Sequence, residues 1–281
     1  MERANIDGIT LEYEVQGSGE PVVFIHGALI ANTFAPLMAE PVLRERFRLI
    51  RYHRRGHAGS SHPDGPTSIS VQVADCLALI RSLGIQRAHV VGHSGGGIIA
   101  LQLALDAPEA VRSLSLLEPA LIGLLPTAPK FFERMGPIIQ MYEAGDKAAA
   151  VDAFLEAVTG RGYRADLDRV LPGAFEQAVA DADTFFGVEL PTLPEWTFRR
   201  EDAARIKQPV LAVLGADSAA VLPSIGEVHQ LLLEWFPQAK PFVLSKATHA
   251  LQMQNPRGMA EGLVAFLERV SMKVTEEVGE R

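Results

Sequence analysis

The stretch Val90-Val91-Gly92-His93-Ser94-Gly95-Gly96-Gly97 decides the fold of this chain. Residues 88–91 form a mostly apolar run typical of a buried strand, and residues 98–105 are typical of a buried helix. The Gly-His-Ser-Gly-Gly segment between them matches the G-x-S-x-G pattern, a sharp strand-to-helix turn that lifts a serine hydroxyl to the top of a sheet. Such a turn leaves little room for side chains, which explains the glycines around Ser94. Ser94 is therefore a candidate nucleophile; the alternative is a glycine-rich turn that happens to carry a serine.

Outward from this stretch, short apolar runs alternate with helical patterns. The hairpin signal Asp7-Gly8 lies within residues 3–15. Further strands are predicted at residues 22–25, 47–52, 114–117, 209–215 and 241–244. This order predicts an α/β fold, with a mostly parallel sheet that is covered by helices on both faces.

Residues 120–201 break this alternation. They show no strand pattern and instead contain helix-like segments at 131–144, 146–159 and 173–187. No flexible linker borders the region on either side. We therefore expect a helical cap inserted at 120–201 into a core formed by residues 1–119 and 202–281.

Composition limits the functions that this chain can have. The 281 residues are 48% hydrophobic and 21% charged, and the net charge is −8. This charge argues against nucleic acid and anionic membranes as partners, and no apolar run is long enough to span a bilayer. The single Cys76 excludes an internal disulfide framework and a cysteine-rich metal site. We expect a cytoplasmic protein with a small-molecule substrate and no metal, and we assign no oligomeric state.

A serine nucleophile requires a base, and a base of this kind is usually held by an acid. His249 is the best-placed histidine, because it follows the last predicted strand in a loop where sites of open α/β sheets form. Glu118 and Asp217 each follow the end of another strand, so either carboxylate could hold the His249 imidazole. His26 and His93 lie in tight turns beside the site, and we interpret them as structural or site-lining.

An oxyanion formed during acyl transfer needs two positioned N–H donors. The Gly95 amide at the start of the helix after Ser94 is the first candidate. Gly27 permits a close approach of the chain after the strand at 22–25, so the Ala28 amide is the second.

These residues resemble the α/β-hydrolase fold superfamily over roughly residues 10–270. The matching segments are F-I-H-G-A, R-R-G-H-A-G-S, G-H-S-G-G-G, P-V-L-A-V-L-G-A-D and A-T-H-A. The resemblance implies Ser94 as nucleophile, His249 as base, and Ala28 with Gly95 as oxyanion donors. A hydrolase of this kind requires no cofactor, and we expect none.

The chain departs from the usual pattern of this superfamily at three places. His53 and Ala58 replace the usual aspartate and glycine of one loop. Ser218 stands where the acid usually does, three residues after the glycine that ends a late strand, and Asp217 comes one residue early. Some members place the acid after the earlier strand, where this chain has Glu118, and we favour Glu118 over Asp217.

The resulting hypothesis is a serine hydrolase that cleaves a medium-sized hydrophobic ester, lactone or related acyl compound through an acyl-enzyme. Serine at position 94 argues against epoxide hydrolases and haloalkane dehalogenases, which use an aspartate there. A carbon–carbon bond hydrolase, a cofactor-free perhydrolase and a low-turnover ligand-sensing protein remain as alternatives. The expected substrate-binding residues are His93, Leu29, Phe131, Met135, Phe185 and Trp196.

Overall fold

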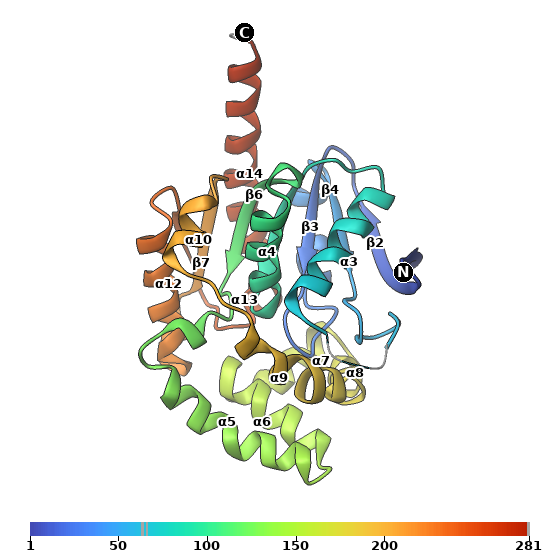
Figure 1. Ribbon diagram of the computed structural model, residues 1–281, viewed down its shortest axis with the longest axis vertical. Helices are drawn as coiled ribbons and strands as arrows, with labels where there is room; N and C mark the ends of the chain where they lie inside the picture. Colours follow the sequence, from blue (N-terminus) through green and yellow to red (C-terminus); the bar gives the residue numbers. More distant parts are fainter. Residues whose placement is uncertain (63–64, 66, 280–281) are drawn as a thin grey trace.

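A sheet of eight strands forms the centre of the molecule (Figure 1). The computed structural model describes residues 1–62, 65 and 67–279, with the backbone alone from residue 273 onward. The spatial order is β1-β2-β4-β3-β5-β6-β7-β8. The pairs β1–β2 and β2–β4 are antiparallel, and every other neighbouring pair, from β4–β3 to β7–β8, is parallel. This confirms the predicted mostly parallel sheet. The strands are β1 (Glu2–Ile6), β2 (Ile9–Gln16), β3 (Glu20–Ile25), β4 (Phe47–Tyr52), β5 (Ala88–His93), β6 (Val111–Leu117), β7 (Val210–Gly215) and β8 (Lys240–Leu244).

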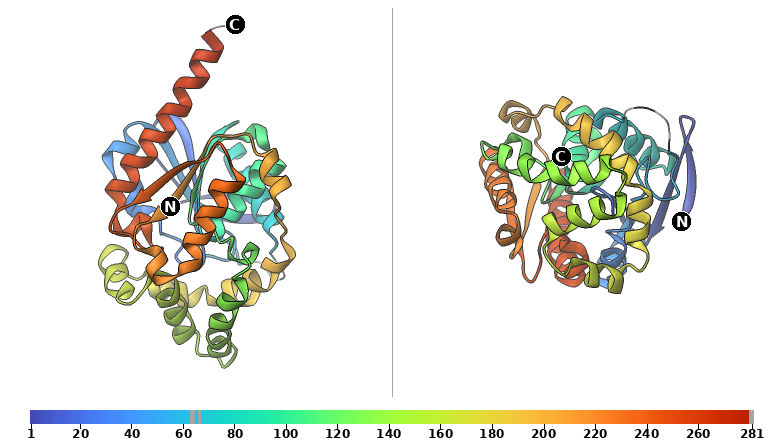
Figure 2. Two further views of the ribbon diagram at one scale, coloured as in Figure 1. Left: turned by 90° about the vertical axis from the view of Figure 1, so that its left-hand side faces the viewer. Right: turned by 90° about the horizontal axis from the view of Figure 1, so that it is seen from below.

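Helices cover both faces of the sheet, as Figure 2 shows in its left view. One face carries α3 (Ile69–Ser82), α4 (Gly95–Asp106), α10 (Arg200–Arg205) and α12 (Pro223–Trp235). The other face carries α1 (Ala35–Met38), α2 (Pro41–Arg44), α13 (Leu251–Gln254) and α14 (Pro256–Gly279). The short elements η1 (Pro108–Ala110) and α11 (Ser218–Val221) connect these layers to the strands.

The core consists of two apolar layers, one on each face of the sheet. On β3, Val23 and Ile25 belong to the layer under α3 and α4, whereas Val22 and Phe24 belong to the layer under α14. Successive strand residues point to opposite faces, so a strand that is covered on both sides must be apolar throughout. This requirement explains the unbroken apolar run at residues 22–25.

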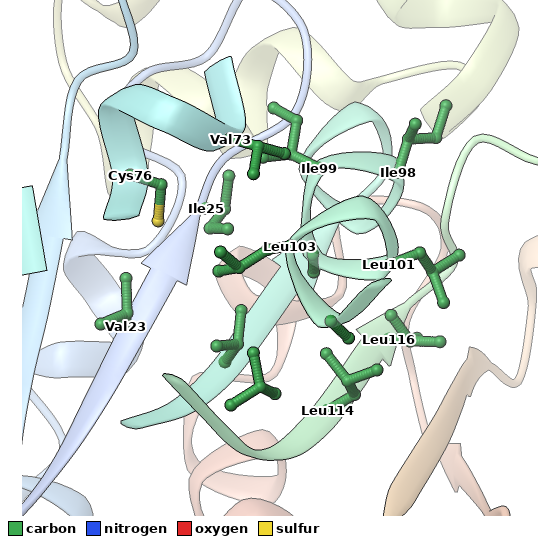
Figure 3. Close-up of a cluster of buried hydrophobic side chains, with 14 of the residues drawn as sticks. Val23, Ile25, Val73, Cys76, Ile98, Ile99, Leu101, Leu103, Leu114 and Leu116 are labelled. Atoms are coloured by element: carbon green, nitrogen blue, oxygen red, sulfur yellow. The ribbon is translucent and has the colours of Figure 1, made fainter. Parts of the chain in front are cut away.

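Helix α4 is fixed in the first of these layers. Figure 3 shows Ile99, Leu101 and Leu103 of α4 within a cluster that includes Val73 of α3 and Leu116 of β6. Burial of each such side chain stabilises the fold by about 1.5–3 kcal/mol. The helix that begins directly after Ser94 therefore rests on a rigid base.

Residues 120–201 are helical, and their helices lie across one end of the sheet (Figure 1). They comprise η2 (Ile122–Leu124), α5 (Ala128–Glu143), α6 (Lys147–Thr159), α7 (Tyr163–Val170), α8 (Ala174–Ala180), the π-helix η3 (Asp183–Glu189), α9 (Leu190–Thr192) and η4 (Leu193–Glu195). The division of the chain into a core and a cap at 120–201 stays a prediction.

Two details of this helical segment differ from the sequence prediction. The helix expected at 173–187 is divided into α8 and η3, because the chain changes to π-helical winding after Ala182. Helix α7 was missed, since its charged residues outnumber the buried Tyr163 and Leu167 that fix it. Among the helices of the described residues, none combines the length and the hydropathy of a membrane-spanning segment.

Candidate active site

Ser94 occupies a strained turn between β5 and α4. Its backbone angles are φ 52° and ψ −121°, a conformation that costs a non-glycine residue of order 1–3 kcal/mol. Three backbone hydrogen bonds hold it there. The Ser94 amide donates to Leu117 O at 3.0 Å, and the Ser94 carbonyl accepts from the amides of Gly97 at 2.9 Å and Ala120 at 3.0 Å. The turn is therefore imposed by its surroundings, as expected for a nucleophile elbow.

Two glycines permit the close contacts of this turn. A Cβ atom on Gly96 would lie 2.0 Å from the carbonyl oxygen of Ile25, and one on Gly27 would lie 2.8 Å from Ser94 Cβ. Both distances are far below van der Waals contact. The chain can bring β3, β5 and α4 together at Ser94 only because these positions carry no side chain.

We expect Gly96→Ala to destabilise the fold by about 3 kcal/mol, because the new methyl group meets backbone atoms that cannot move aside. The thermal unfolding midpoint should fall by on the order of 10 °C. Gly95→Ala is the matched control, since a Cβ atom on Gly95 meets nothing within 4 Å. Calorimetry of the two variants checks the prediction, and equal midpoints would contradict it.

His249 and Glu118 meet at the ends of the central strands. His249 Nδ1 lies 2.7 Å from Glu118 Oε2. The other oxygen of the carboxylate, Oε1, accepts from the Gly215 amide at 2.7 Å and from Ser218 Oγ at 2.5 Å. Glu118 is only 2% exposed and, with φ 44°, has a second strained backbone. These contacts fix both the position of the carboxylate and the side of the imidazole that faces it.

Asp217, the other candidate acid, lies elsewhere. Its side chain is exposed, and its backbone precedes α11. The next residue, Ser218, is buried, and its hydroxyl donates to Glu118. Ser218 occupies the position at which this superfamily usually has its acid. In this chain, the residue at that position instead donates a hydrogen bond to the Glu118 carboxylate.

Two further histidines beside Ser94 have structural contacts. Burial lowers the pKa of His93 to about 3, so its ring is neutral near pH 7. The neutral ring directs Nε2 at the His249 carbonyl oxygen, 2.8 Å away, and thereby holds the loop that carries the base. Burial also lowers the pKa of His26 well below its usual value. Both histidines are thus poor candidates for a general base.

A cavity of about 420 Å³ lies above Ser94. Ser94, Gly95, Ala28 and His249 all line it. Within the described part of the chain, the amides of Ala28 and Gly95 donate to no backbone carbonyl, so both are available to a ligand. The structure thus brings the candidate nucleophile, base and oxyanion donors to one space.

The wall of this cavity is mostly apolar. Four of the six expected substrate-binding residues line it, namely Phe131, Met135, Phe185 and Trp196. His93 and Leu29 do not: His93 lies behind the elbow against the His249 loop, and Leu29 is fully buried against the helical segment. Their neighbours Ser94 and Ala28 occupy the wall instead, because side chains on either side of a tight turn point in different directions.

Four polar residues of the wall were not predicted from the sequence: Arg54, Gln72, Glu189 and Thr192. Arg54 is 3% exposed and forms a buried ion pair with Glu189 of the π-helix. Burial opposes ionisation of Glu189, but the neighbouring Arg54 and His57 outweigh it and lower its pKa to about 2. The Arg54-Arg55 pair, one residue beyond the end of β4 and so at the ligand-binding end of a parallel strand, was a signal that could have identified Arg54.

Comparison with known proteins identifies the class that this fold and site define. A family model described as alpha/beta hydrolase fold matches residues 20–256, so the chain belongs to this family. It is 28% identical over 270 residues to "Putative carbamate hydrolase RutD" of Azorhizobium caulinodans, covering 91% of this chain and 94% of that one. It is 29% identical over 269 residues to "Putative non-heme bromoperoxidase BpoC" of Mycobacterium tuberculosis, covering 93% and 99%. The crystal structure of the enol-lactonase from Burkholderia xenovorans LB400 is similar with a TM-score of 0.78, at 23% identity, covering 95% of this chain and all (100%) of that one.

Proposed function

We propose that this protein is a serine hydrolase that cleaves a carboxylic ester, a lactone or a related acyl compound. The observation that carries the proposal is the 2.7 Å contact between His249 Nδ1 and Glu118 Oε2, formed at the cavity that Ser94 also lines. A carboxylate on Nδ1 keeps the proton on that nitrogen and leaves Nε2 free as a base.

In the first half of the reaction, Nε2 of His249 takes the proton of Ser94 Oγ as this oxygen attacks the acyl carbon. The carbonyl electron pair moves to the oxygen, which the amides of Ala28 and Gly95 bind. Collapse of the tetrahedral intermediate breaks the bond to the leaving alcohol, which takes the proton from His249. In the second half, water repeats these steps on the acyl-enzyme and releases the acid.

The cavity favours a medium-sized hydrophobic substrate. Its wall includes aromatic and aliphatic side chains from α5, α6 and η3, among them Phe131, Phe154 and Phe185. The charges of Arg54 and Glu189 neutralise each other at close range. A volume of about 420 Å³ is within the range of sites for small molecules.

Two relatives support acyl chemistry without defining the substrate. A carbamate hydrolase by name and an enol-lactonase both imply attack on an acyl carbon. The bromoperoxidase name of the other relative supports a second candidate, perhydrolysis, in which hydrogen peroxide replaces water as the attacking group on the acyl-enzyme.

A labelling experiment combined with a substrate panel tests the proposal. A fluorophosphonate should react at Ser94, as identified by mass spectrometry of the digested protein. Among p-nitrophenyl esters, kcat/KM should be highest for medium acyl chains and at least about tenfold lower for short charged ones, since each buried CH₂ contributes about 0.8 kcal/mol. Absence of both the label and ester turnover would refute the proposal. Peroxide-dependent bromination faster than hydrolysis would favour perhydrolysis.

A further inference from the structure

Arg54 forms the centre of a buried polar network between the candidate oxyanion hole and the helical segment. Its Nε donates to His26 O at 3.1 Å, and its Nη2 donates to Gly27 O at 2.8 Å. Nη1 donates to Gln72 Oε1 and to Glu189 Oε1. Nη2 also lies 3.2 Å from Glu189 Oε2 and 3.2 Å from His57 Nε2. All three guanidinium nitrogens are thus engaged by the protein itself.

The contact with Gly27 O determines the direction of the Ala28 amide. The Gly27 carbonyl and the Ala28 N–H belong to one planar peptide, so fixing the oxygen also fixes the opposite N–H. A cation on the carbonyl oxygen further polarises the peptide, which makes its N–H a stronger donor.

His26 holds the same carbonyl from a second side. The Arg54 amide donates to His26 Nε2 at 3.0 Å, so in the neutral ring the proton is on Nδ1. Nδ1 lies 2.8 Å from Gly27 O. Directly after this peptide, Leu29 has φ 64° and the Ile30 amide donates to Ala28 O at 2.7 Å, which closes a tight turn around Leu29.

Glu189 connects this arrangement to the helical segment. It is the last residue of the π-helix η3, whose Phe185 lines the cavity. π-Helical winding is rare and concentrates at functional sites. Here the π-helix places Phe185, which lines the cavity, and Glu189, the carboxylate partner of Arg54, within one helical turn.

We propose that Arg54 is a positioning residue for the oxyanion hole and that Glu189 couples the hole to the helical segment. Arg54 holds the Gly27–Ala28 peptide so that the Ala28 N–H is directed into the cavity over Ser94. Glu189 keeps the guanidinium in place, so that displacement of η3 weakens the hole. The inference rests on the proposed function, because an oxyanion hole matters only for acyl transfer.

The competing role for Arg54 is recognition of a substrate carboxylate. The network argues against it, because Glu189 neutralises the guanidinium and the five N–H donors already have protein acceptors. A free anion would have to displace Glu189 from a buried ion pair. The two roles predict different substrate preferences, since only recognition would make anionic esters the better substrates.

Arg54→Lys tests the proposal with a pair of inhibitors. Lysine keeps the charge but cannot hold His26 O, Gly27 O and Glu189 simultaneously. A trifluoromethyl ketone adds to Ser94 and forms an oxyanion, whereas the matched methyl ketone binds without forming one. We expect Arg54→Lys to lower kcat and to raise Ki for the trifluoromethyl ketone, each by about 10- to 100-fold. This effect is smaller than the roughly 10²–10³-fold loss of kcat that follows the removal of an oxyanion-hole donor. KM and Ki for the methyl ketone should change less than about twofold.

Arg55→Lys is the matched control. Arg55 is the next residue of the same loop and forms a partly buried bidentate ion pair with Asp75. Its Nε donates to Asp75 Oδ2 at 2.5 Å and its Nη2 donates to Asp75 Oδ1 at 2.6 Å. Its substitution removes a similar ion pair and should leave the inhibitor ratio unchanged. Glu189→Gln is a milder second variant that keeps Arg54, and it should raise the trifluoromethyl ketone Ki by about three- to tenfold.

The outcomes separate the two proposals. If the wild-type protein neither turns over esters nor binds the trifluoromethyl ketone more tightly than the methyl ketone, the proposed function fails. If the wild type shows this preference and folded Arg54→Lys and Glu189→Gln retain it, the positioning role is overturned. If Arg54→Lys weakens both ketones equally, or selectively abolishes turnover of anionic esters, Arg54 acts in ground-state binding, which also overturns the inference.

Discussion

Ser94→Ala is expected to lower kcat on an ester substrate by about 10⁶-fold and to leave KM nearly unchanged. The expected loss is this large because the serine oxygen is the attacking atom and alanine carries no hydroxyl in its place. The amides of Ala28 and Gly95 remain in the variant. A residual rate of about 10³–10⁴ over the uncatalysed reaction should therefore persist.

Pre-steady-state kinetics and a matched serine variant check this prediction. The wild type should release a burst of p-nitrophenol, and the acylated peptide should contain Ser94. Ser115→Ala is the control, because Ser115 is a buried serine of the adjacent strand β6 whose hydroxyl has no hydrogen-bond partner among the described residues. It should keep the full rate and the full stability. A Ser94→Ala protein, free of wild-type contamination, that still gives the burst would contradict the proposed mechanism.

The strands and the elbow could be predicted from sequence because their causes are local. An apolar run such as residues 22–25 needs cover on both faces, and the glycine at 92 is required by contacts with Gly96 and Gly97 in the same short turn. The helical segment was less predictable. Helix α7 is short and mostly charged, and η3 has π-helical winding, so neither shows the long apolar pattern of 3.6-residue period that predicts a helix.

The acid could not be decided from sequence because its position depends on the register between strands. Glu118 and Asp217 both follow strand ends, and only the pairing of β6 with β7 shows which carboxylate faces His249. Arg54 was missed for a related reason. Its acceptors are two backbone carbonyls, a glutamine and a glutamate that lies 135 residues further along the chain, so no spacing rule points to them.

Glu118→Gln is expected to lower kcat by about 10⁴-fold, although the side chain keeps its size. The reason lies in the donors around the carboxylate. Gly215 N–H and Ser218 O–H both point at Oε1, so the amide oxygen of glutamine must take that position. The amide NH₂ group then faces His249 Nδ1 and can only donate to it. The proton of the imidazole moves to Nε2, and the ring can no longer accept the proton of Ser94.

Asp217→Asn is the matched control for this prediction, because it makes the same chemical change on the exposed candidate acid. It should change kcat by less than about twofold, as expected for a surface substitution away from the site. Steady-state kinetics of both variants on one ester decide the matter, with thermal unfolding to show that Glu118→Gln stays folded. The reverse order of effects would make Asp217 the acid and would mean that the 2.7 Å contact of Glu118 with His249 has no catalytic role. An equal loss in both variants would instead indicate that the two carboxylates act on the imidazole through a shared network.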